Sequence, residues 1–329
     1  MSDRVAAPEL RFDVYIDRSD RRLALRADVL AGLTAEPKEL SPKWFYDAWG
    51  STLFEDITHL PEYYLTSRER SILVAHARDI AELTRANTLV ELGSGSSEKT
   101  RLLLDAMVAA GHLKRFIPFD VSEPALRDSA ARIADEYRGL EIHAVVGDFE
   151  RHIGRLPEGH RRLVAFLGSS VGNLVAEQRA RFLAELREYL NPGEALLLGT
   201  DLVKDPVRLE AAYNDSGGVT AEFNRNVLAV INRELRANFD LARFEHVARY
   251  DAEHEWMDIG LRSTVDQRVG IEDLGLTVEF GAGEEMRTEI SDKFRRDGVE
   301  AELAAAGLEL RDWWTDPAGD FALSLSFAV

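Results

Sequence analysis

A glycine pair between an apolar run and an amphipathic run is the strongest chemical signal in the chain. It lies in the segment Leu89–Thr100, LVELGSGSSEKT, at an expected turn from a first strand into a first helix. Glycines at such a turn let backbone N–H groups approach a ligand, and the start of the helix adds partial positive charge. The spacing Glu91-x-Gly93-x-Gly95 therefore indicates a site for a nucleotide or a nucleoside, with an ordinary tight turn as the alternative.

Glu98 distinguishes the cofactor classes that use such a turn. A phosphate-binding P-loop needs a glycine at this position, before Lys99 and Thr100, and a dinucleotide fingerprint needs its third glycine here. A carboxylate would face the pyrophosphate, so a nicotinamide oxidoreductase is disfavoured. S-adenosylmethionine has no phosphate, and the pattern ExGxG at the end of a first strand is typical of its sites.

Two further acids follow the next expected strands. Asp120 ends the run FIPFDV, where a carboxylate can accept hydrogen bonds from both ribose hydroxyls. Asp148 and Phe149 follow the run IHAVVGD, where the acid can accept from the adenine amino group and the ring can pack on the base. A helix cap and a core aromatic are the ordinary alternatives. Because parallel strands end at one edge of a sheet, the three segments together predict an S-adenosylmethionine site.

The composition excludes several other functions. The 40 basic and 58 acidic residues give a net charge of −18, so nucleic acid and anionic membranes are not expected as partners. The 329 residues include no cysteine, which excludes disulfides and thiol nucleophiles. Asp251, Glu253, His254 and Glu255 lack a second histidine at ligand spacing, so we interpret them as a solvated acidic helix face and expect no metal. Without a long apolar run, we expect a cytoplasmic protein. The sequence itself does not give the oligomeric state, and a monomer is a separate expectation.

Short apolar runs alternate with amphipathic helices in the part of the chain that carries these motifs. A capping-box spacing at Thr66 and Glu69 predicts the start of a helix. Five strands follow, at about 88–93, 116–121, 142–148, 162–169 and 194–201, with helices at about 97–110, 122–139 and 175–190. This alternation predicts an α/β fold with a parallel sheet that is buried on both faces.

The length favours two domains, since single cores stop growing beyond about 250–300 residues. A terminal hairpin that includes FALSLSFAV is expected to complete the parallel sheet. We therefore assign residues 68–203 and 293–329 to a cofactor-binding domain. Residues 21–67 and 204–292 are assigned to a second, α+β, substrate-binding domain, and residues 1–20 are expected to be loosely ordered.

From about residue 40 to its C-terminus the chain resembles the histidine-specific N-alpha-methyltransferases of ergothioneine biosynthesis. The segments that carry the resemblance are LPEYYLTSRE, ELGSGSSEKT, PFDVSEPAL, VVGDFERH, GSSVGNL, LGTDLVKDPVRL, GVTAEFNRNVLAVINREL, GEEMRTEIS and WWTDPAGDF. The resemblance implies a Rossmann-like class I methyltransferase sheet, mostly parallel with a C-terminal antiparallel hairpin. It also implies a reaction: three methyl groups pass from S-adenosylmethionine to the alpha-amine of L-histidine, giving hercynine.

The resemblance also implies two sets of site residues. The expected cofactor contacts are Gly93, Lys99, Asp120, Asp148 and Phe149. The expected histidine contacts are Tyr63, Asn173, Tyr213, Glu289 and Ser291. Three nearby positions depart from the family pattern, with Leu65 in place of a proline, Ile259 in place of a methionine and Gly260 in place of a bulky aromatic residue.

Residue chemistry suggests a role for several of these side chains. Glu289 and Ser291 are spaced i, i+2, so in an extended segment both side chains lie on one face. Together they can pair with both nitrogens of an imidazole. An exposed charged strand is the ordinary alternative. Asn173 and Tyr213 can donate to a carboxylate, and Tyr63 can contact either end of the substrate. The rings of Phe54 and Tyr46 can attract the growing quaternary ammonium. We expect no dedicated catalytic base, because a neutral amine is already a nucleophile.

Two rival functions remain open from the sequence. A relative that methylates another aromatic amino acid, such as a tryptophan derivative, is disfavoured by the pair Glu289 and Ser291, because an indole has one N–H donor and no acceptor. A non-catalytic partner subunit would bind S-adenosylmethionine without turnover.

Overall fold

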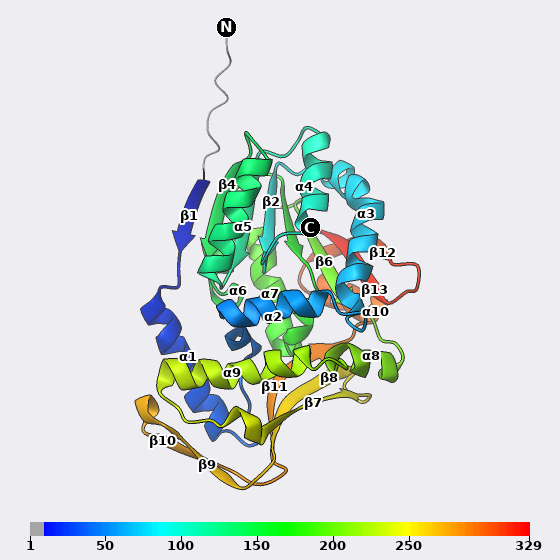
Figure 1. Cartoon of the computed structure of the whole chain (residues 1–329). Coiled ribbons are helices and arrows are strands. Elements are labelled where there is room, and N and C mark those ends of the chain that lie inside the picture. The colour runs from blue at the N-terminus through cyan, green and yellow to red at the C-terminus, as the bar shows by residue number, and fades with distance from the viewer. Residues whose placement is uncertain (1–9) are drawn as a thin grey trace. The chain divides into compact units, whose positions relative to one another are not determined.

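The computed structural model describes residues 10–329, which fall into two compact units, and Figure 1 labels most of their helices and strands. Unit 1 contains the described part of Met1–Ile16 together with Leu65–Val203 and Lys293–Val329. Unit 2 contains Asp17–Tyr64 and Lys204–Asp292. That unit 1 binds the cofactor and unit 2 the substrate stays a prediction.

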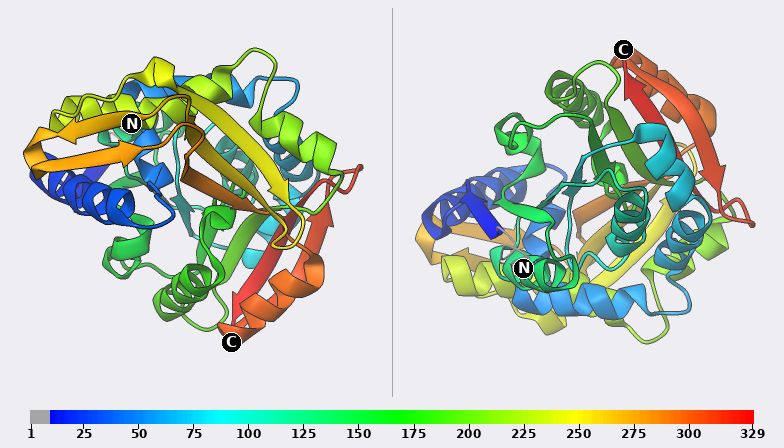
Figure 2. Two further views of the ribbon diagram at one scale, coloured as in Figure 1. Left: turned by 90° about the horizontal axis from the view of Figure 1, so that it is seen from below. Right: turned by 90° about the horizontal axis from the view of Figure 1, so that it is seen from above.

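Unit 1 is built on an eight-stranded sheet with the order β1-β4-β3-β2-β5-β6-β13-β12. Its strands are β1 (Leu10–Val14), β2 (Thr88–Leu92), β3 (Arg115–Asp120), β4 (Glu141–Val146), β5 (Arg162–Phe166), β6 (Ala195–Asp201), β12 (Leu308–Thr315) and β13 (Phe321–Ala328). β13 is antiparallel to both β6 and β12, whereas the remaining pairs are parallel. Figure 2 shows this C-terminal hairpin at the red end of the colour scale. The expected Rossmann-like class I methyltransferase sheet is confirmed.

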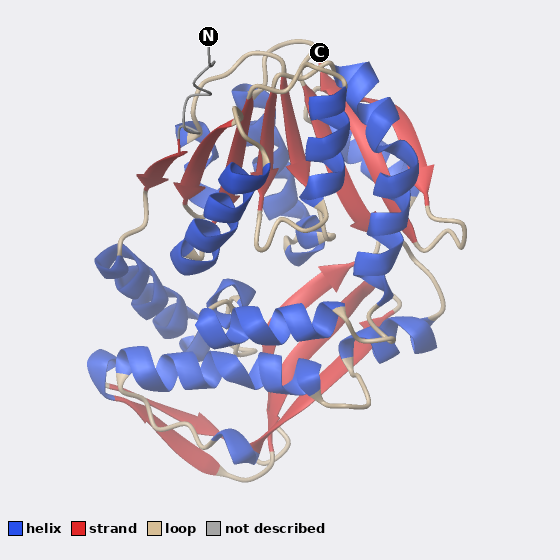
Figure 3. Ribbon diagram, turned by 45° about the horizontal axis from the view of Figure 1, so that its top comes forward, coloured by secondary structure: helices blue, strands red, loops and turns tan. Residues whose placement is uncertain are grey.

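Helices cover both faces of this sheet. In Figures 1 and 3, α3 (Tyr64–Thr84), α4 (Thr100–Ala109) and α5 (Glu123–Glu136) lie over one face. On the other face, α7 (Ala176–Tyr189) and α10 (Arg296–Ala305) share a core with β2, β5 and β6. Every residue of β2, β5 and β6 is buried, as expected for central parallel strands. Short helical turns, α6 (Phe149–His152), η2 (Ile153–Arg155) and η3 (Ser170–Asn173), follow β4 and β5.

The expectation of a loosely ordered N-terminal segment was wrong for residues 10–20, while residues 1–9 lie outside the described part of the chain. β1 pairs in parallel with β4, from Leu10 opposite Ile142 to Val14 opposite Val146. Its sequence LRFDV alternates apolar and charged residues, which is the period of an edge strand. α1 (Arg18–Thr34) follows, and its N-cap Asp17 accepts a hydrogen bond from the N–H of Asp20.

Unit 2 is an α+β unit with its own core. Its helices are α1, α2 (Ala48–Thr58), α8 (Pro206–Tyr213) and α9 (Val219–Leu235), with short turns η1 (Pro42–Phe45), η4 (Leu241–Arg243) and η5 (Glu272–Leu274). A three-stranded antiparallel sheet has the order β11-β8-β7, from β7 (Phe244–Asp251), β8 (Trp256–Ser263) and β11 (Glu285–Asp292). β9 (Gln267–Ile271) and β10 (Leu276–Phe280) form a separate hairpin. The α9 side chains Val227 and Ile231 share one core with Phe45, Leu261 and Met286.

Two local expectations were wrong. α3 begins at Tyr64 rather than at a cap on Thr66, and Glu69 is fully buried with tertiary partners instead of closing a capping box. The acidic cluster around His254 lies in the turn between β7 and β8 and not on a helix, since the carboxylate of Asp251 accepts hydrogen bonds from the N–H groups of Glu253 and His254.

Within residues 10–329, no group of three or more His, Cys, Asp or Glu side chains is arranged to hold a metal ion. A search of the same residues for a helix of sufficient length and apolarity to cross a membrane finds none.

Candidate functional site

The glycine loop of unit 1 is tied to the end of the neighbouring strand. Gly93 and Gly95 have φ of 69° and 48°, a region that favours glycine. The carboxylate of Asp120 accepts a hydrogen bond from the N–H of Gly95 at 2.9 Å and another from the N–H of Ser122 at 2.8 Å. The N–H of Gly147, after β4, donates to the carbonyl oxygen of Asp120. The predicted loop, the acid of β3 and the turn after β4 therefore meet at one sheet edge.

A buried carboxylate lies directly under the loop. Glu91, in β2, accepts hydrogen bonds from the hydroxyls of Thr100 and Ser94, the latter at 2.7 Å, and more weakly from Ser97. Burial raises the pKa of Glu91 to about 7, although these hydroxyls and the charge of Lys99 lower it. Glu91 therefore connects both ends of the loop to the strand that precedes it.

Asp148 and Phe149 lie after β4 and carry the roles that sequence reasoning gave as the ordinary alternatives. Asp148 is the N-cap of α6 and accepts from the N–H of Glu150 at 2.9 Å. The ring of Phe149 contacts the rings of Phe166 and Phe182, with centroids 5.2 Å and 5.7 Å away. Contact of either residue with adenine stays a prediction.

Lys99 lies at the N-terminus of α4 and forms an ion pair with the buried Glu69 of α3. The other oxygen of the Glu69 carboxylate accepts a hydrogen bond from the N–H of Gly168 at 2.7 Å. Gly168 follows β5, so this carboxylate joins α3, the glycine loop and the loop after β5 within unit 1.

The residues at this edge fit S-adenosylmethionine. A Cβ added at Gly93 or Gly95 would meet no heavy atom within 4 Å, so the space beside the loop backbone is open. The donor set is also suitable, because carboxylates such as Asp120 can accept from ribose hydroxyls and an ammonium such as Lys99 can pair with the carboxylate of the methionine part.

Asn173 ends the turn η3 in the loop after β5. Gly168 and Ser169 at the start of this loop both have left-handed backbone conformations, with φ of 76° and 60°. The hydroxyl of Ser169 accepts from the N–H of Asp201 at 2.9 Å, and the carboxylate of Asp201 forms a fully buried ion pair with Lys293 at 3.1 Å. The backbone that carries Asn173 is therefore anchored to the end of β6.

In unit 2, two buried hydroxyls form the centre of the candidate substrate face. The hydroxyls of Tyr213, the last residue of α8, and Ser291, in β11, lie 2.9 Å apart. Glu289 and Ser291 are both in β11, after a bulge that follows Arg287. The extended backbone required by the i, i+2 argument is therefore present, and side-chain alternation puts Glu289 and Ser291 on one face of the strand.

Hydrogen bonds from His246 and Asn224 fix the C-terminal end of α8. The carbonyl of Tyr213 can only accept, so Nε2 of His246 donates to it at 2.8 Å. Nδ1 of His246 then accepts from the side-chain amide of Asn224 at 2.9 Å, and that amide also donates to the carbonyl of Gly260. Burial lowers the pKa of His246, which favours the neutral ring, and the carbonyl of Tyr213 sets its tautomer.

The predicted aromatic residues of unit 2 form a continuous cluster. The ring of Phe54 contacts those of Tyr46, Tyr63 and Phe223, with centroid distances of 5.6, 6.4 and 5.9 Å. Tyr63 in turn contacts Tyr213 at 6.3 Å. This aromatic cluster therefore leads from α2 to the buried hydroxyl of Tyr213.

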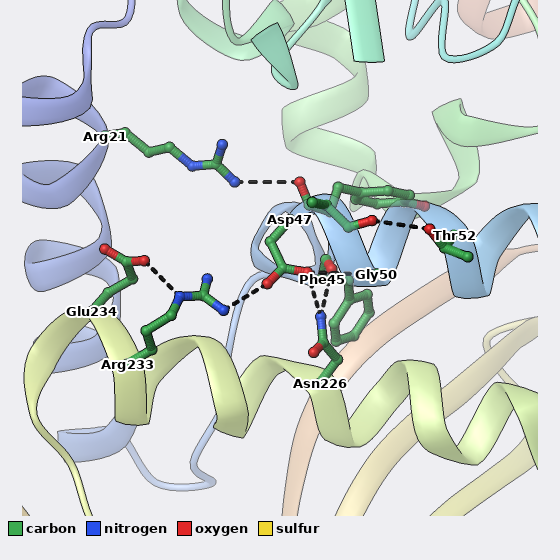
Figure 4. A network of polar contacts seen from close by, with 10 residues as sticks. Arg21, Phe45, Asp47, Gly50, Thr52, Asn226, Arg233 and Glu234 are labelled. Atoms are coloured by element: carbon green, nitrogen blue, oxygen red, sulfur yellow. Dashed lines mark hydrogen bonds and ion pairs between the residues drawn. The ribbon is translucent and has the colours of Figure 1, made fainter. Parts of the chain in front are cut away.

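A polar network fixes the backbone beside this cluster (Figure 4). Asp47 caps α2 by accepting from the N–H of Gly50, and it also accepts from Asn226 and Arg233 at 2.9 Å each. Burial would raise the pKa of Asp47, but these donors together lower it. Gly50 is required here, because a Cβ would lie 1.7 Å from the carbonyl oxygen of Phe45.

The three departures from the family pattern are buried. Leu65 and Ile259 each have 2% of their surface exposed. A Cβ at Gly260 would lie 2.7 Å from the carbonyl oxygen of Met286, so this backbone register leaves no room for a side chain.

Sequence reasoning missed the contacts of three residues, Glu69 and Glu91 in unit 1 and His246 in unit 2. Glu69 was assigned to a helix cap, the hydroxyl partners of Glu91 were not recognised, and His246 was not selected. The partners of Glu69 and His246 are distant in sequence. The hydroxyls of Ser94, Ser97 and Thr100 lie within nine residues of Glu91, and this short spacing could have predicted their hydrogen bonds to it.

Comparison with known proteins supplies the family. The sequence profile of the family described as "Histidine-specific methyltransferase, SAM-dependent" matches residues 25–328. Two relatives are named histidine N-alpha-methyltransferase. The protein of Mycolicibacterium smegmatis is 58% identical over 312 residues, 95% of this chain and 97% of the relative. That of Mycobacterium tuberculosis is 59% identical over 304 residues, 92% of this chain and 95% of the relative.

A more distant relative is ergothioneine biosynthesis protein 1 of Neurospora crassa. It is 30% identical over 306 residues, which are 90% of this chain and 34% of that protein. The profile match covers most of the chain, and the two bacterial relatives align along nearly their whole lengths. This chain therefore belongs to the family of histidine-specific, S-adenosylmethionine-dependent methyltransferases.

Proposed function

We propose that this chain transfers three methyl groups, one from each of three S-adenosylmethionine molecules, to the alpha-amine of L-histidine. The product is hercynine, and the names of the relatives support a place in ergothioneine biosynthesis. The observation that carries the proposal is the polar face of unit 2, where Glu289 shares one face of β11 with the buried hydroxyl pair of Ser291 and Tyr213. We also expect the chain to act in the cytoplasm as a monomer.

The imidazole has one N–H donor and one acceptor nitrogen in its neutral form. Glu289 can accept from the N–H, and the hydroxyl of Ser291 can donate to the other nitrogen. The hydroxyl of Tyr213 takes part in the same pair and can donate to Ser291 or to the ligand. An indole would leave one of these groups unpaired, and a buried unpaired polar group is costly.

S-adenosylmethionine supplies a methyl group that is already activated on a sulfonium, so the protein residues mainly bind, orient and exclude water. Asp120 and Lys99 would hold the ribose and the methionine carboxylate, and Asp148 and Phe149 would contact the adenine. Asn173 would donate to the carboxylate of histidine. Loss of one proton makes the alpha-amine a nucleophile, and we assign no dedicated catalytic base to this step.

The aromatic cluster of Tyr46, Phe54 and Tyr63 suits a substrate whose charge becomes permanent. A dimethylated amine is still able to lose a proton, whereas the trimethylated product is a fixed cation. Ring faces attract such cations by about 0.5–2 kcal/mol. We therefore assign Phe54 and Tyr46 to the last methylation step.

The test is incubation of the protein with L-histidine and S-adenosylmethionine, followed by mass spectrometry. Accumulation of trimethylhistidine supports the proposal. Parallel reactions with L-tryptophan and L-tyrosine test the rival amino acids. Binding of S-adenosylhomocysteine without methylation of histidine would overturn the proposed substrate, and absence of methylation with every amine would favour the non-catalytic partner subunit.

A further inference from the structure

Glu69 is a fully buried acid for which the proposed reaction has no direct use. It lies in α3, and its side chain is closed off from bulk solvent. A buried carboxylate needs good partners, because removal of its charge from water is unfavourable. The arrangement of these partners indicates what Glu69 does.

Each oxygen of the Glu69 carboxylate has a separate partner. Oε1 accepts a hydrogen bond from the backbone N–H of Gly168 at 2.7 Å. Oε2 forms the ion pair with the ammonium of Lys99. The backbone of Gly168 therefore fixes Oε1, and Oε2 in turn holds the flexible side chain of Lys99.

The space around Oε1 is closed on the side of β6. A Cβ added at Gly199 would lie 2.3 Å from this oxygen and 3.3 Å from the ring of Phe321. Only glycine at position 199 leaves the carboxylate where it is. The backbone at Gly168, in the loop after β5, and at Gly199, in β6, therefore defines the position of the Glu69 carboxylate.

We propose that Glu69 is a positioning residue that holds the ammonium of Lys99 for the carboxylate of S-adenosylmethionine. This inference rests on the proposed function, in which Lys99 is a cofactor contact. A lysine ammonium has three N–H donors, and the ion pair with Glu69 uses one of them. The side chain of Lys99 is 24% exposed, so the surrounding protein does not enclose it completely.

The expected benefit is preorganisation. Fixing a lysine side chain costs rotamer entropy, and in this chain that cost arises during folding. Without the ion pair, the side chain of Lys99 would lose this rotamer entropy when the cofactor binds, and the affinity would be lower. The alternative is that Glu69 only stabilises unit 1, in which case its effect is independent of Lys99.

Glu69→Gln is the central variant, because glutamine keeps the shape and the bond to Gly168 but loses the negative charge. We expect the Kd for S-adenosylhomocysteine, measured by calorimetry, and the KM for S-adenosylmethionine to rise about tenfold, with the KM for histidine within about twofold. Glu69→Asp should recover part of the affinity. An unchanged or lower Kd in Glu69→Gln would overturn the proposal.

A double-mutant cycle separates positioning from stability. If Glu69 acts through Lys99, adding Glu69→Gln to Lys99→Met should change the Kd for S-adenosylhomocysteine by less than about twofold. Full additivity of the two losses would show that Glu69 does not act through Lys99. Gly199→Ala is a second test of the same role, because the added Cβ displaces Oε1 of Glu69 without changing a charge. This variant should also raise the Kd for S-adenosylhomocysteine.

Glu194→Gln is a matched control. Glu194 forms an ion pair with Arg162 in which each side chain is 5% exposed, at the start of β5 and so at the opposite end of the sheet. This variant should lose stability but keep its Kd for S-adenosylhomocysteine. This Kd is measured without histidine, so it tests the positioning role of Glu69 alone. If histidine were not the substrate, the unsubstituted protein would fail to methylate it, whatever the Kd values of the variants.

Discussion

The phenol oxygen of Tyr213 lies 2.9 Å from the hydroxyl oxygen of Ser291, and the two residues are 78 positions apart in the sequence. Both side chains are buried, with 7% and 4% of their surfaces exposed. The pair joins the end of α8 to β11, the strand that also carries Glu289. The candidate substrate face of unit 2 is thus centred on an interaction that no local sequence pattern contains.

Tyr213→Phe should remove the hydroxyl and retain the ring contact with Tyr63. We expect the KM for histidine to rise about tenfold, because a hydroxyl at Ser291 loses its buried partner. The Kd for S-adenosylhomocysteine should stay within about twofold. Tyr137→Phe, which removes a hydroxyl bonded to Asp105 in unit 1, is the control and should change neither value. Equal losses for both ligands in Tyr213→Phe would contradict the assignment.

Glu289→Gln tests the recognition of the imidazole. A site that accepts a hydrogen bond from a ligand discriminates strongly against its loss, so the KM for histidine should rise at least about tenfold while cofactor affinity is retained. Glu285→Gln in the same strand is the matched control. Its carboxylate pairs with Arg249 and Arg262, so the change should affect stability rather than histidine binding. A similar decrease in both affinities for Glu289→Gln would assign that residue a structural role.

Phe54→Leu removes a ring from the aromatic cluster and keeps an apolar side chain. The loss of cation attraction should be greatest for the last methyl transfer. We expect mono- and dimethylhistidine to accumulate, which mass spectrometry of a time course would detect. Phe54→Trp should retain trimethylation. An unchanged product distribution in Phe54→Leu would show that the ring has no role in the last step.

Glu91→Gln should change how stability depends on pH. Between its ordinary pKa of 4.5 and its folded value of about 7, Glu91 binds a proton in the folded protein that the unfolded chain has released. The free energy of unfolding therefore falls as the pH rises through this window. Relative to the variant, the unsubstituted protein should lose about 3 kcal/mol between pH 4.5 and pH 7.5. Urea unfolding at several pH values measures this difference, and parallel curves for the two proteins would refute the raised pKa.

The sequence predicted the backbone of the glycine-loop edge in unit 1 more directly than that of the candidate substrate face in unit 2, for a physical reason. Gly93 follows β2 and Asp120 ends β3, and the apolar pattern of these parallel strands is enough to bring their carboxyl ends to one edge. Glu289 and Ser291 could be assigned to one face only if their segment was extended, which β11 now provides. The roles of these residues stay predictions.

The errors arose where tertiary contacts decide the structure. Glu69 has the spacing of a capping box with Thr66, but its carboxylate is bonded to Gly168, 99 residues away. β1 was missed because a five-residue edge strand with two charged residues has little apolar signal of its own, and it is stabilised by pairing with β4. His246 is placed by Asn224 and Tyr213, which are 22 and 33 residues away.

The position of β13 between β6 and β12 has a consequence for biosynthesis. In the completed sheet, Ser324 of β13 pairs with Leu198 of β6, which the ribosome has polymerised 126 residues earlier. At about 5–20 residues per second, the nascent chain spends roughly 6–25 s with one edge of β6 uncovered. An uncovered apolar edge is a template for pairing with other chains. Translation that stops before Phe321 should therefore yield a product that aggregates, even though the glycine loop and the strands around it are already complete.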